Sequence, residues 1–169
     1  MRPAYLVAGV RTPIGKHRGA LASVRADDLA AHMIVSLLEH RSPTLLTKVD
    51  HVVFGATNQA GEDNRNIARM ASLLAGLSYS VPGVTVNRLC GSGLEAVSDA
   101  VRRVATGDAD CVIAGGVESM TRAPFVFGKA DEPFPRTPPK VYDTSLGWRF
   151  ENPKMAERVR LDSMGETAE

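Results

Sequence analysis

The chain has 169 residues, of which 44% are hydrophobic, so it is long enough for one domain with a sizeable core. Its 20 lysines and arginines nearly balance its 19 aspartates and glutamates, which disfavours a nucleic-acid partner or a membrane surface. Only 5% of residues are aromatic, which argues against the basic and aromatic surface that binds single-stranded nucleic acid. No apolar run has the length of a signal peptide or a bilayer crossing, and we expect a cytoplasmic protein.

The cysteines and histidines do not form a metal-binding pattern. The two cysteines, Cys90 and Cys111, make no CxxC pair, and no cluster of cysteine and histidine has the spacing of metal ligands. The sequence therefore predicts neither a disulfide framework nor a metal site.

Short β-type runs alternate with longer stretches of helical period over the first 117 residues. This alternation is typical of a sheet covered by helices. The expected strands span residues 4–10, 49–56, 84–89 and 111–117. The expected helices span residues 27–40, 64–75 and 91–106. We therefore predict an α/β fold with the element order βαβαβαβ.

The expected helices carry start and stop signals. We expect Asn64 to cap the second helix, Gly76 to stop it, and Gly107 to stop the third. The first helix places six apolar side chains on one face, which should lie against the sheet. These are Leu29, Ala30, Met33, Ile34, Leu37 and Leu38. The glycine pair at 115–116 indicates either a close approach of a backbone or ligand, or a tight turn.

The character of the chain changes after the fourth expected strand. Six prolines interrupt the remainder, at positions 124, 133, 135, 138, 139 and 153. An irregular stretch of this length is a functional loop, a disordered tail or part of something larger. We assign residues 1–117 to an α/β half and residues 118–169 to an irregular segment, in which a capped helix begins at SMGETAE.

The segment VNRLCGSGLEAV carries the sharpest chemical signal. A strand runs into Cys90, and a helix follows at once. Free N–H groups and the dipole at a helix N-terminus favour a thiolate, and a thiolate is the nucleophilic form of cysteine. Gly91 and Gly93 leave room for a thioester, and a backbone N–H at this turn is suited to hold an oxyanion. From these residues alone two interpretations stay open, a nucleophile and a small core cysteine.

The segment from Asn87 through Gly93 resembles the nucleophile motif N-x-x-C-G-S-G of the thiolase family. RTPIG, AGEDNRNIARMAS, GDADCVIAGGVESMTRAPFV and MGETAE also resemble thiolase sequence and occur in the expected order. The resemblance covers essentially the whole chain. QAGEDNRNIARMA, RAPFVFGKAD and DTSLGWRFENP look closest to the β-ketoadipyl-CoA (3-oxoadipyl-CoA) thiolases of aromatic-compound breakdown.

This resemblance implies a fold and a reaction. The fold is a thiolase-like α/β half with helices packed on a mixed sheet, followed by the start of an inserted loop domain at residues 118–169. The reaction is cleavage of a 3-oxoacyl-CoA by CoA through an acyl thioester on Cys90, or the reverse Claisen condensation. Coenzyme A is a co-substrate, and no tightly bound cofactor is implied.

The resemblance also implies groups that these residues lack. The family's catalytic histidine lies in a G-H-P motif and its second cysteine in a C-x-G motif, and neither motif is present. We expect Cys111 to be a core residue, and the four histidines, at positions 17, 32, 40 and 51, to be structural. Met164 matches a family position that lines the acyl pocket, with filling of a core gap as the alternative.

Partners follow from the same resemblance. We expect binding of acyl-CoA and CoA, a homodimer or homotetramer, and no nucleic-acid or membrane partner. An alternative is a non-catalytic half subunit, or assembly partner, that requires a complementary chain. A different cysteine acyltransferase or a cysteine hydrolase is a third hypothesis. Half of such a fold exposes an apolar face, so we expect the chain to self-associate.

Overall fold

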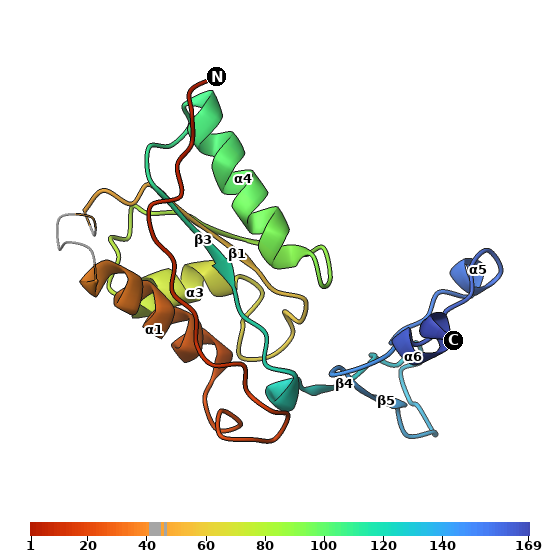
Figure 1. The fold of residues 1–169 in the computed structure, drawn as a ribbon. Helices are drawn as coiled ribbons and strands as arrows, with labels where there is room; N and C mark the ends of the chain where they lie inside the picture. Colours follow the sequence, from red (N-terminus) through yellow and green to blue (C-terminus); the bar gives the residue numbers. More distant parts are fainter. Residues whose placement is uncertain (41–44, 46) are drawn as a thin grey trace. The chain divides into compact units, whose positions relative to one another are not determined.

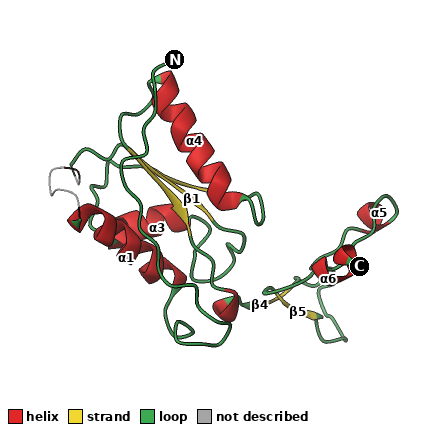
Figure 2. Cartoon of the chain, in the orientation of Figure 1, coloured by secondary structure: helices red, strands yellow, loops and turns green. Residues whose placement is uncertain are grey.

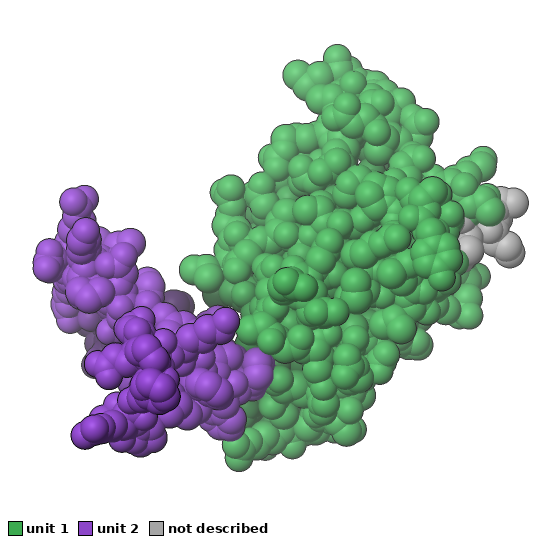
Figure 3. Space-filling view, turned by 180° about the vertical axis from the view of Figure 1, so that it is seen from behind, with its two compact units in different colours: residues 1–122 green, residues 123–169 purple. Residues whose placement is uncertain are grey.

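The chain forms two compact units, Met1–Arg122 and Ala123–Glu169, shown in Figure 3. The computed structural model describes residues 1–40, 45 and 47–169. Figures 1 and 2 show the helices and strands of each unit.

A three-stranded parallel sheet lies at the centre of the first unit. Its strands are β1 (His51–Gly55), β2 (Gly83–Val86) and β3 (Val112–Gly116), in the order β2-β1-β3. Phe54 of β1 lies opposite Thr85 of β2 and Gly115 of β3. The expectation of a mixed sheet is wrong for the described residues. A helix connects each strand to the next and returns the chain to the same end of the sheet, so all three strands run in parallel.

Three long helices cover this sheet: α1 (Ala26–Glu39), α3 (Ile67–Leu74) and α4 (Ser92–Thr106). In Figure 1, α1 and α3 lie together on one side of the sheet and α4 lies on the other. The path from β1 to β2 and the path from β2 back to β3 run in opposite directions. Two right-handed crossovers of this kind place their helices on opposite faces.

The core lies between the sheet and the pair formed by α1 and α3. Its fully buried members include Ile34 of α1, Val52 of β1, and Ile67, Ala68 and Ala71 of α3. The predicted apolar face of α1 is confirmed, because Ala30, Ile34 and Leu38 are buried and its other three members are half-buried. The small alanines of α3 allow that helix to lie close to both α1 and the sheet.

Two predicted helix ends are confirmed, since Gly76 and Gly107 follow α3 and α4 with left-handed φ values of 80° and 89°. The predicted start of α3 is wrong. Asn66, not Asn64, is the N-cap, and its side chain accepts a hydrogen bond from the Arg69 N–H. Asn64 has a φ of 49° and is incompatible with a helix start, because the loop turns back there.

Residues 4–10 do not form the predicted strand, and no strand pairing is recorded for them among the described residues. Tyr5, Leu6 and Val7 are 79%, 92% and 70% exposed, so these side chains are not packed against the core. A run with β propensity becomes a strand only where a neighbouring edge and a buried face are present.

The second unit contains short elements. β4 (Phe125–Phe127) pairs antiparallel with β5 (Val141–Asp143), and α5 (Pro153–Ala156) and α6 (Met164–Ala168) follow. The predicted capped helix near the C-terminus is confirmed, because Ser163 and Glu166 form a reciprocal capping box at α6. Among the described residues of the whole chain, no helix has the length and apolar composition needed to cross a bilayer.

Candidate functional site

Cys90 lies in a tight turn between β2 and α4. β2 ends at Val86, three residues earlier than predicted, because the chain leaves the sheet there to form this turn. Leu89, the residue before the cysteine, has a left-handed φ of 49°. A non-glycine residue in this conformation carries strain of about 1–3 kcal/mol. The Cys90 side chain itself is exposed. The turn therefore presents the thiol at the surface, immediately before the N-terminus of a 15-residue helix.

Local hydrogen bonds close this turn. The Ser92 hydroxyl accepts from the Arg88 N–H at 2.8 Å and donates to the Leu89 carbonyl at 2.6 Å. The Gly91 N–H donates to the Arg88 carbonyl at 3.0 Å, and the Ser92 N–H donates to the Leu89 carbonyl at 3.0 Å. These bonds fix the backbone on both sides of Cys90.

The N-terminus of α4 lies directly on the end of the sheet. A methyl group on Gly55, the last residue of β1, would lie 2.4 Å from the Ser92 carbonyl carbon and 2.6 Å from the Gly93 nitrogen. A methyl group on Gly116, the last residue of β3, would lie 2.6 Å from the Gly55 oxygen. Close approach of a backbone therefore accounts for the second residue of the predicted glycine pair.

The two glycines after the cysteine differ in their surroundings. The Gly91 N–H is already engaged within the turn, as described above. A side chain added at Gly93 would meet no atom within 4 Å, so this side of the turn is open. Open space thus lies beside Gly93, whereas the Gly91 N–H takes part in the turn.

Cys111 lies in a different environment from Cys90. It lies just before β3, is half-buried, and its backbone N–H donates to the Asp50 carboxylate at 2.9 Å. Burial raises the pKa of the Cys111 thiol, and the Asp50 carboxylate raises it further. A thiol held in its neutral form is a poor nucleophile, so Cys111 is poorly suited to that role.

The four histidines and Met164 lie in other elements and loops of the chain. His51 begins β1, where burial lowers the pKa of its imidazole, and the other three histidines are exposed. Met164 of α6 is 79% exposed. In the part of the chain that the structure describes, no three His, Cys, Asp or Glu side chains lie close enough to hold a metal ion.

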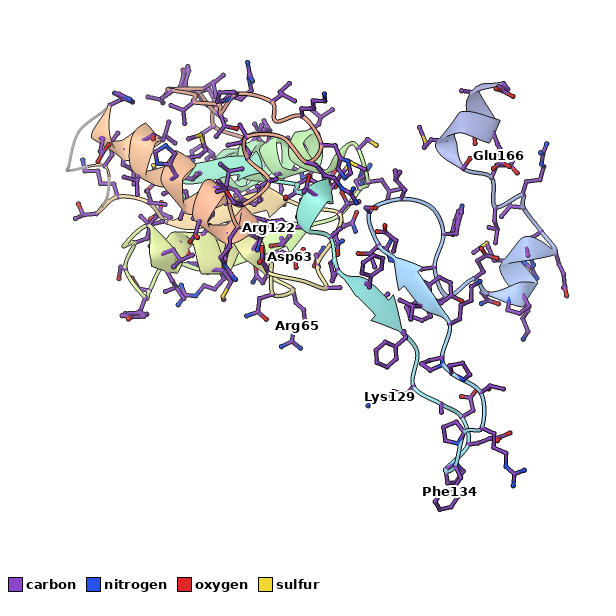
Figure 4. All side chains as sticks on the ribbon, turned by 90° about the horizontal axis from the view of Figure 1, so that it is seen from below. Asp63, Arg65, Arg122, Lys129, Phe134 and Glu166 are labelled. Carbon is purple, nitrogen blue, oxygen red and sulfur yellow. The ribbon has the colours of Figure 1, made fainter. Side chains whose placement is uncertain are left out.

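A charged cluster missed by sequence reasoning joins three loops at the carboxyl end of the sheet. The Arg122 guanidinium binds both carboxylate oxygens of Glu62, one of them at 2.6 Å, and Arg25 approaches the same carboxylate at 3.5 Å. The hydrogen bond from Arg122 holds the pKa of Glu62 below its ordinary value. Neighbouring Arg65 points away from the sheet into solvent (Figure 4). No short motif contains these partners, because they are 60 or more residues from Arg122.

Each unit has a cavity among its described residues, and Cys90 lines neither of these two cavities. The cavity in the first unit has a volume of about 400 Å³ and lies between residues 11–17, α1 and the segment after β3. The cavity in the second unit has a volume of about 620 Å³ and is lined by the segment between β4 and β5 together with Phe150.

Fold and site together define an α/β protein that presents a cysteine at the carboxyl edge of a parallel sheet, between a strand and a helix N-terminus. The family model described as thiolase, N-terminal domain, matches residues 4–146. The chain belongs to the thiolase family.

Curated relatives and a solved structure agree with this assignment. The chain is 59% identical over its full length to the 3-oxoadipyl-CoA/3-oxo-5,6-dehydrosuberyl-CoA thiolase of Escherichia coli K12, and 56% identical over 99% of its length to the β-ketoadipyl-CoA thiolase of Pseudomonas knackmussii. It spans 42% of the length of each of these relatives. The crystal structure of the Bacillus anthracis acetyl-CoA acetyltransferase matches with a TM-score of 0.78 and 32% identity, over 94% of this chain and 38% of that one.

Proposed function

We propose that this chain carries the nucleophile of a thiolase and that Cys90 is that nucleophile. The observation that carries the proposal is the exposed thiol in a strained turn at the N-terminus of α4. Helix N-termini stabilise a thiolate, and nearby glycines let a thioester approach. The family assignment supports acyl-CoA chemistry at this position.

The proposed reaction has two steps. In the first, the Cys90 thiolate attacks the keto carbon of a 3-oxoacyl-CoA, the bond between the second and third acyl carbons breaks, and acetyl-CoA leaves once its enolate carbon gains a proton. In the second, the sulfur of free CoA attacks the acyl thioester, and the cysteine leaves as the thiolate. A covalent intermediate of this kind divides one difficult transfer into two easier ones. Coenzyme A acts as co-substrate, and no tightly bound cofactor enters either step.

We propose a substrate of the 3-oxoadipyl-CoA class, which would yield succinyl-CoA and acetyl-CoA. The names of the relatives that are 59% and 56% identical to this chain support this acyl group. We propose that Gly93 leaves room for the thioester. Gly91 is proposed to keep the shape of the turn beside which the oxyanion forms. Met164 is proposed to line the acyl pocket once a segment outside these 169 residues covers it, since it is 79% exposed here.

Proton transfer requires groups that these residues do not supply. The chain contains neither a G-H-P nor a C-x-G motif. Because the chain spans 42% of its relatives, we propose that the acid/base groups belong to a further segment or a complementary chain. We also propose that residues 1–117 are the α/β half and residues 118–169 the start of an inserted loop domain. A homodimer or homotetramer and a cytoplasmic location remain predictions of the family resemblance.

Intact mass spectrometry after incubation with 3-oxoadipyl-CoA or acetyl-CoA tests the proposal, with Cys90→Ser as the control. The expected result is one acyl adduct on the wild-type protein, located on Cys90 by peptide mapping and absent from the control. An adduct on another residue, or no adduct on a folded protein of full thiolase length, would contradict the assignment of Cys90.

A further inference from the structure

Three loop segments meet next to the Cys90 turn, each at the carboxyl end of one strand of the sheet. Thr57 lies two residues after β1, Asn87 lies one residue after β2, and Glu118 lies two residues after β3. Hydrogen bonds join these three side chains or their backbones in series. The series leads to Leu89, the strained residue next to the cysteine.

The series begins at the Glu118 carboxylate. One oxygen accepts from the Thr57 N–H at 2.6 Å and from the Thr57 hydroxyl, and the other accepts from the Asn58 N–H at 3.3 Å. Hydrogen bonds to an ionised acceptor are about twice as strong as neutral ones. The carboxylate therefore fixes the Thr57 backbone relative to the end of β3.

The Asn87 side chain carries the series onward and uses both ends of its amide. Its Nδ2 donates to the Thr57 carbonyl at 3.1 Å, and its Oδ1 accepts from the Leu89 N–H at 2.9 Å. One end must donate and the other must accept, so turning the amide by 180° would break both bonds. The amide thus has one orientation, and this orientation fixes the Leu89 N–H.

Leu89 is the point at which this series acts on the thiol. Its φ of 49° is unfavourable for a side chain that branches beyond Cβ, and such strain persists only where surrounding contacts impose it. The bond from Asn87 is one of those contacts. Release of Leu89 to an ordinary backbone conformation would turn Cys90 away from the N-terminus of α4.

We propose that Glu118, Thr57 and Asn87 form a positioning relay that holds the Cys90 thiol at the N-terminus of α4. The proposal rests on the assignment of Cys90 as the thiolase nucleophile. In this proposal, none of the three residues contacts a reacting atom. They act through the backbone of Leu89, and their effect is on the reactivity of the thiol.

The same sheet offers a matched control at its other end. The Asp50 carboxylate, just before β1, accepts from the Asp110 and Cys111 N–H groups at 2.7 and 2.9 Å. This is also a carboxylate that bridges the flanks of β1 and β3, as Glu118 does. Because it lies at the amino end of the strands, its removal should weaken the fold and leave the Cys90 turn unchanged.

The test measures the rate of Cys90 alkylation by iodoacetamide in the intact protein, with peptide mapping to separate Cys90 from other cysteines. We expect Asn87→Ala and Glu118→Gln each to slow alkylation by about tenfold, the scale on which a helix terminus stabilises a thiolate. Cys90 is already exposed, so loosening the turn adds no access that would offset this loss. The double variant should be no slower than Asn87→Ala alone, because residues in one series are not additive.

Several outcomes would overturn the relay. One is an unchanged alkylation rate in Asn87→Ala together with a fall in urea stability like that of Asp50→Asn, which would show a purely structural role. Another is a double variant whose rate falls by the product of the two single effects. Should Asn87→Ala fail to fold, the alkylation rate of Glu118→Gln alone tests the relay. Glu118 is exposed, so this substitution should leave the protein folded. Acylation by 3-oxoadipyl-CoA is measured separately, so a wild-type protein of full thiolase length that alkylates normally without acylating would refute the thiolase proposal and not the relay.

Discussion

Replacement of Gly55 by alanine tests how closely α4 lies on the sheet. The added methyl group would lie 2.4 Å from the Ser92 carbonyl carbon and 2.5 Å from its oxygen, whereas ordinary contact begins at 3.4 Å. The obstructing atoms are backbone, so no side chain can turn aside. The start of α4 must move by about 1 Å, and we expect a loss of about 3 kcal/mol in the free energy of unfolding, the upper part of the range for overpacked sites.

Urea unfolding followed by circular dichroism measures this change, and Gly115→Ala is the matched control. A methyl group on Gly115 would meet only the Phe54 ring, at 3.4 Å and beyond. We expect this control to be neutral, or more stable by about 0.5–1 kcal/mol, because alanine loses less conformational freedom on folding. Equal stabilities for the two variants would refute the close approach of α4 to β1.

Three further variants or measurements test other parts of the first unit. Arg122→Met should lower the free energy of unfolding at pH 7, and the deficit should shrink as the pH falls below 4.5. Arg122 lowers the pKa of Glu62, so this pair stabilises the fold above the ordinary carboxyl pKa, and the stabilisation is lost when Glu62 is protonated. A deficit that does not change with pH would contradict this reasoning. Asn66→Ala should cost about 1–2 kcal/mol in urea unfolding, because it removes the N-cap of α3 and two hydrogen bonds to β2, one to the Gly83 carbonyl and one from the Thr85 hydroxyl. Cys111 should react with iodoacetamide at least about tenfold more slowly in the native protein than in urea, since burial keeps its thiol neutral.

The sequence predicted the helices well because their signals are local. The period of α1 and the left-handed glycine after α4 each lie within one element, and both predictions are confirmed. Residues 4–10 failed because strand formation depends on a partner edge, which no local pattern contains. Asn64 and Asn66 are both suitable caps, and the choice between them depends on where the loop turns back.

The candidate site divides in the same way. The Cys90 motif is contiguous, so its place between a strand and a helix followed from the sequence. The bond from Thr57 to Glu118 spans 61 residues, and the bond from Asn87 to Thr57 spans 30. Such pairs come together only when parallel strands align their carboxyl ends. A single sequence offers no signal that joins Glu118 to the turn.

The far end of α4 has a practical consequence for production of this protein. Arg2 donates from its backbone to the Ala105 carbonyl at 3.2 Å, and its guanidinium binds the carbonyls of Val104 and Ala109. The first residues of the chain thus cap the C-terminus of α4, the helix whose N-terminus follows Cys90. An affinity tag fused before Met1 would be attached directly beside this cap. A tag placed elsewhere, or one removed completely, leaves α4 undisturbed.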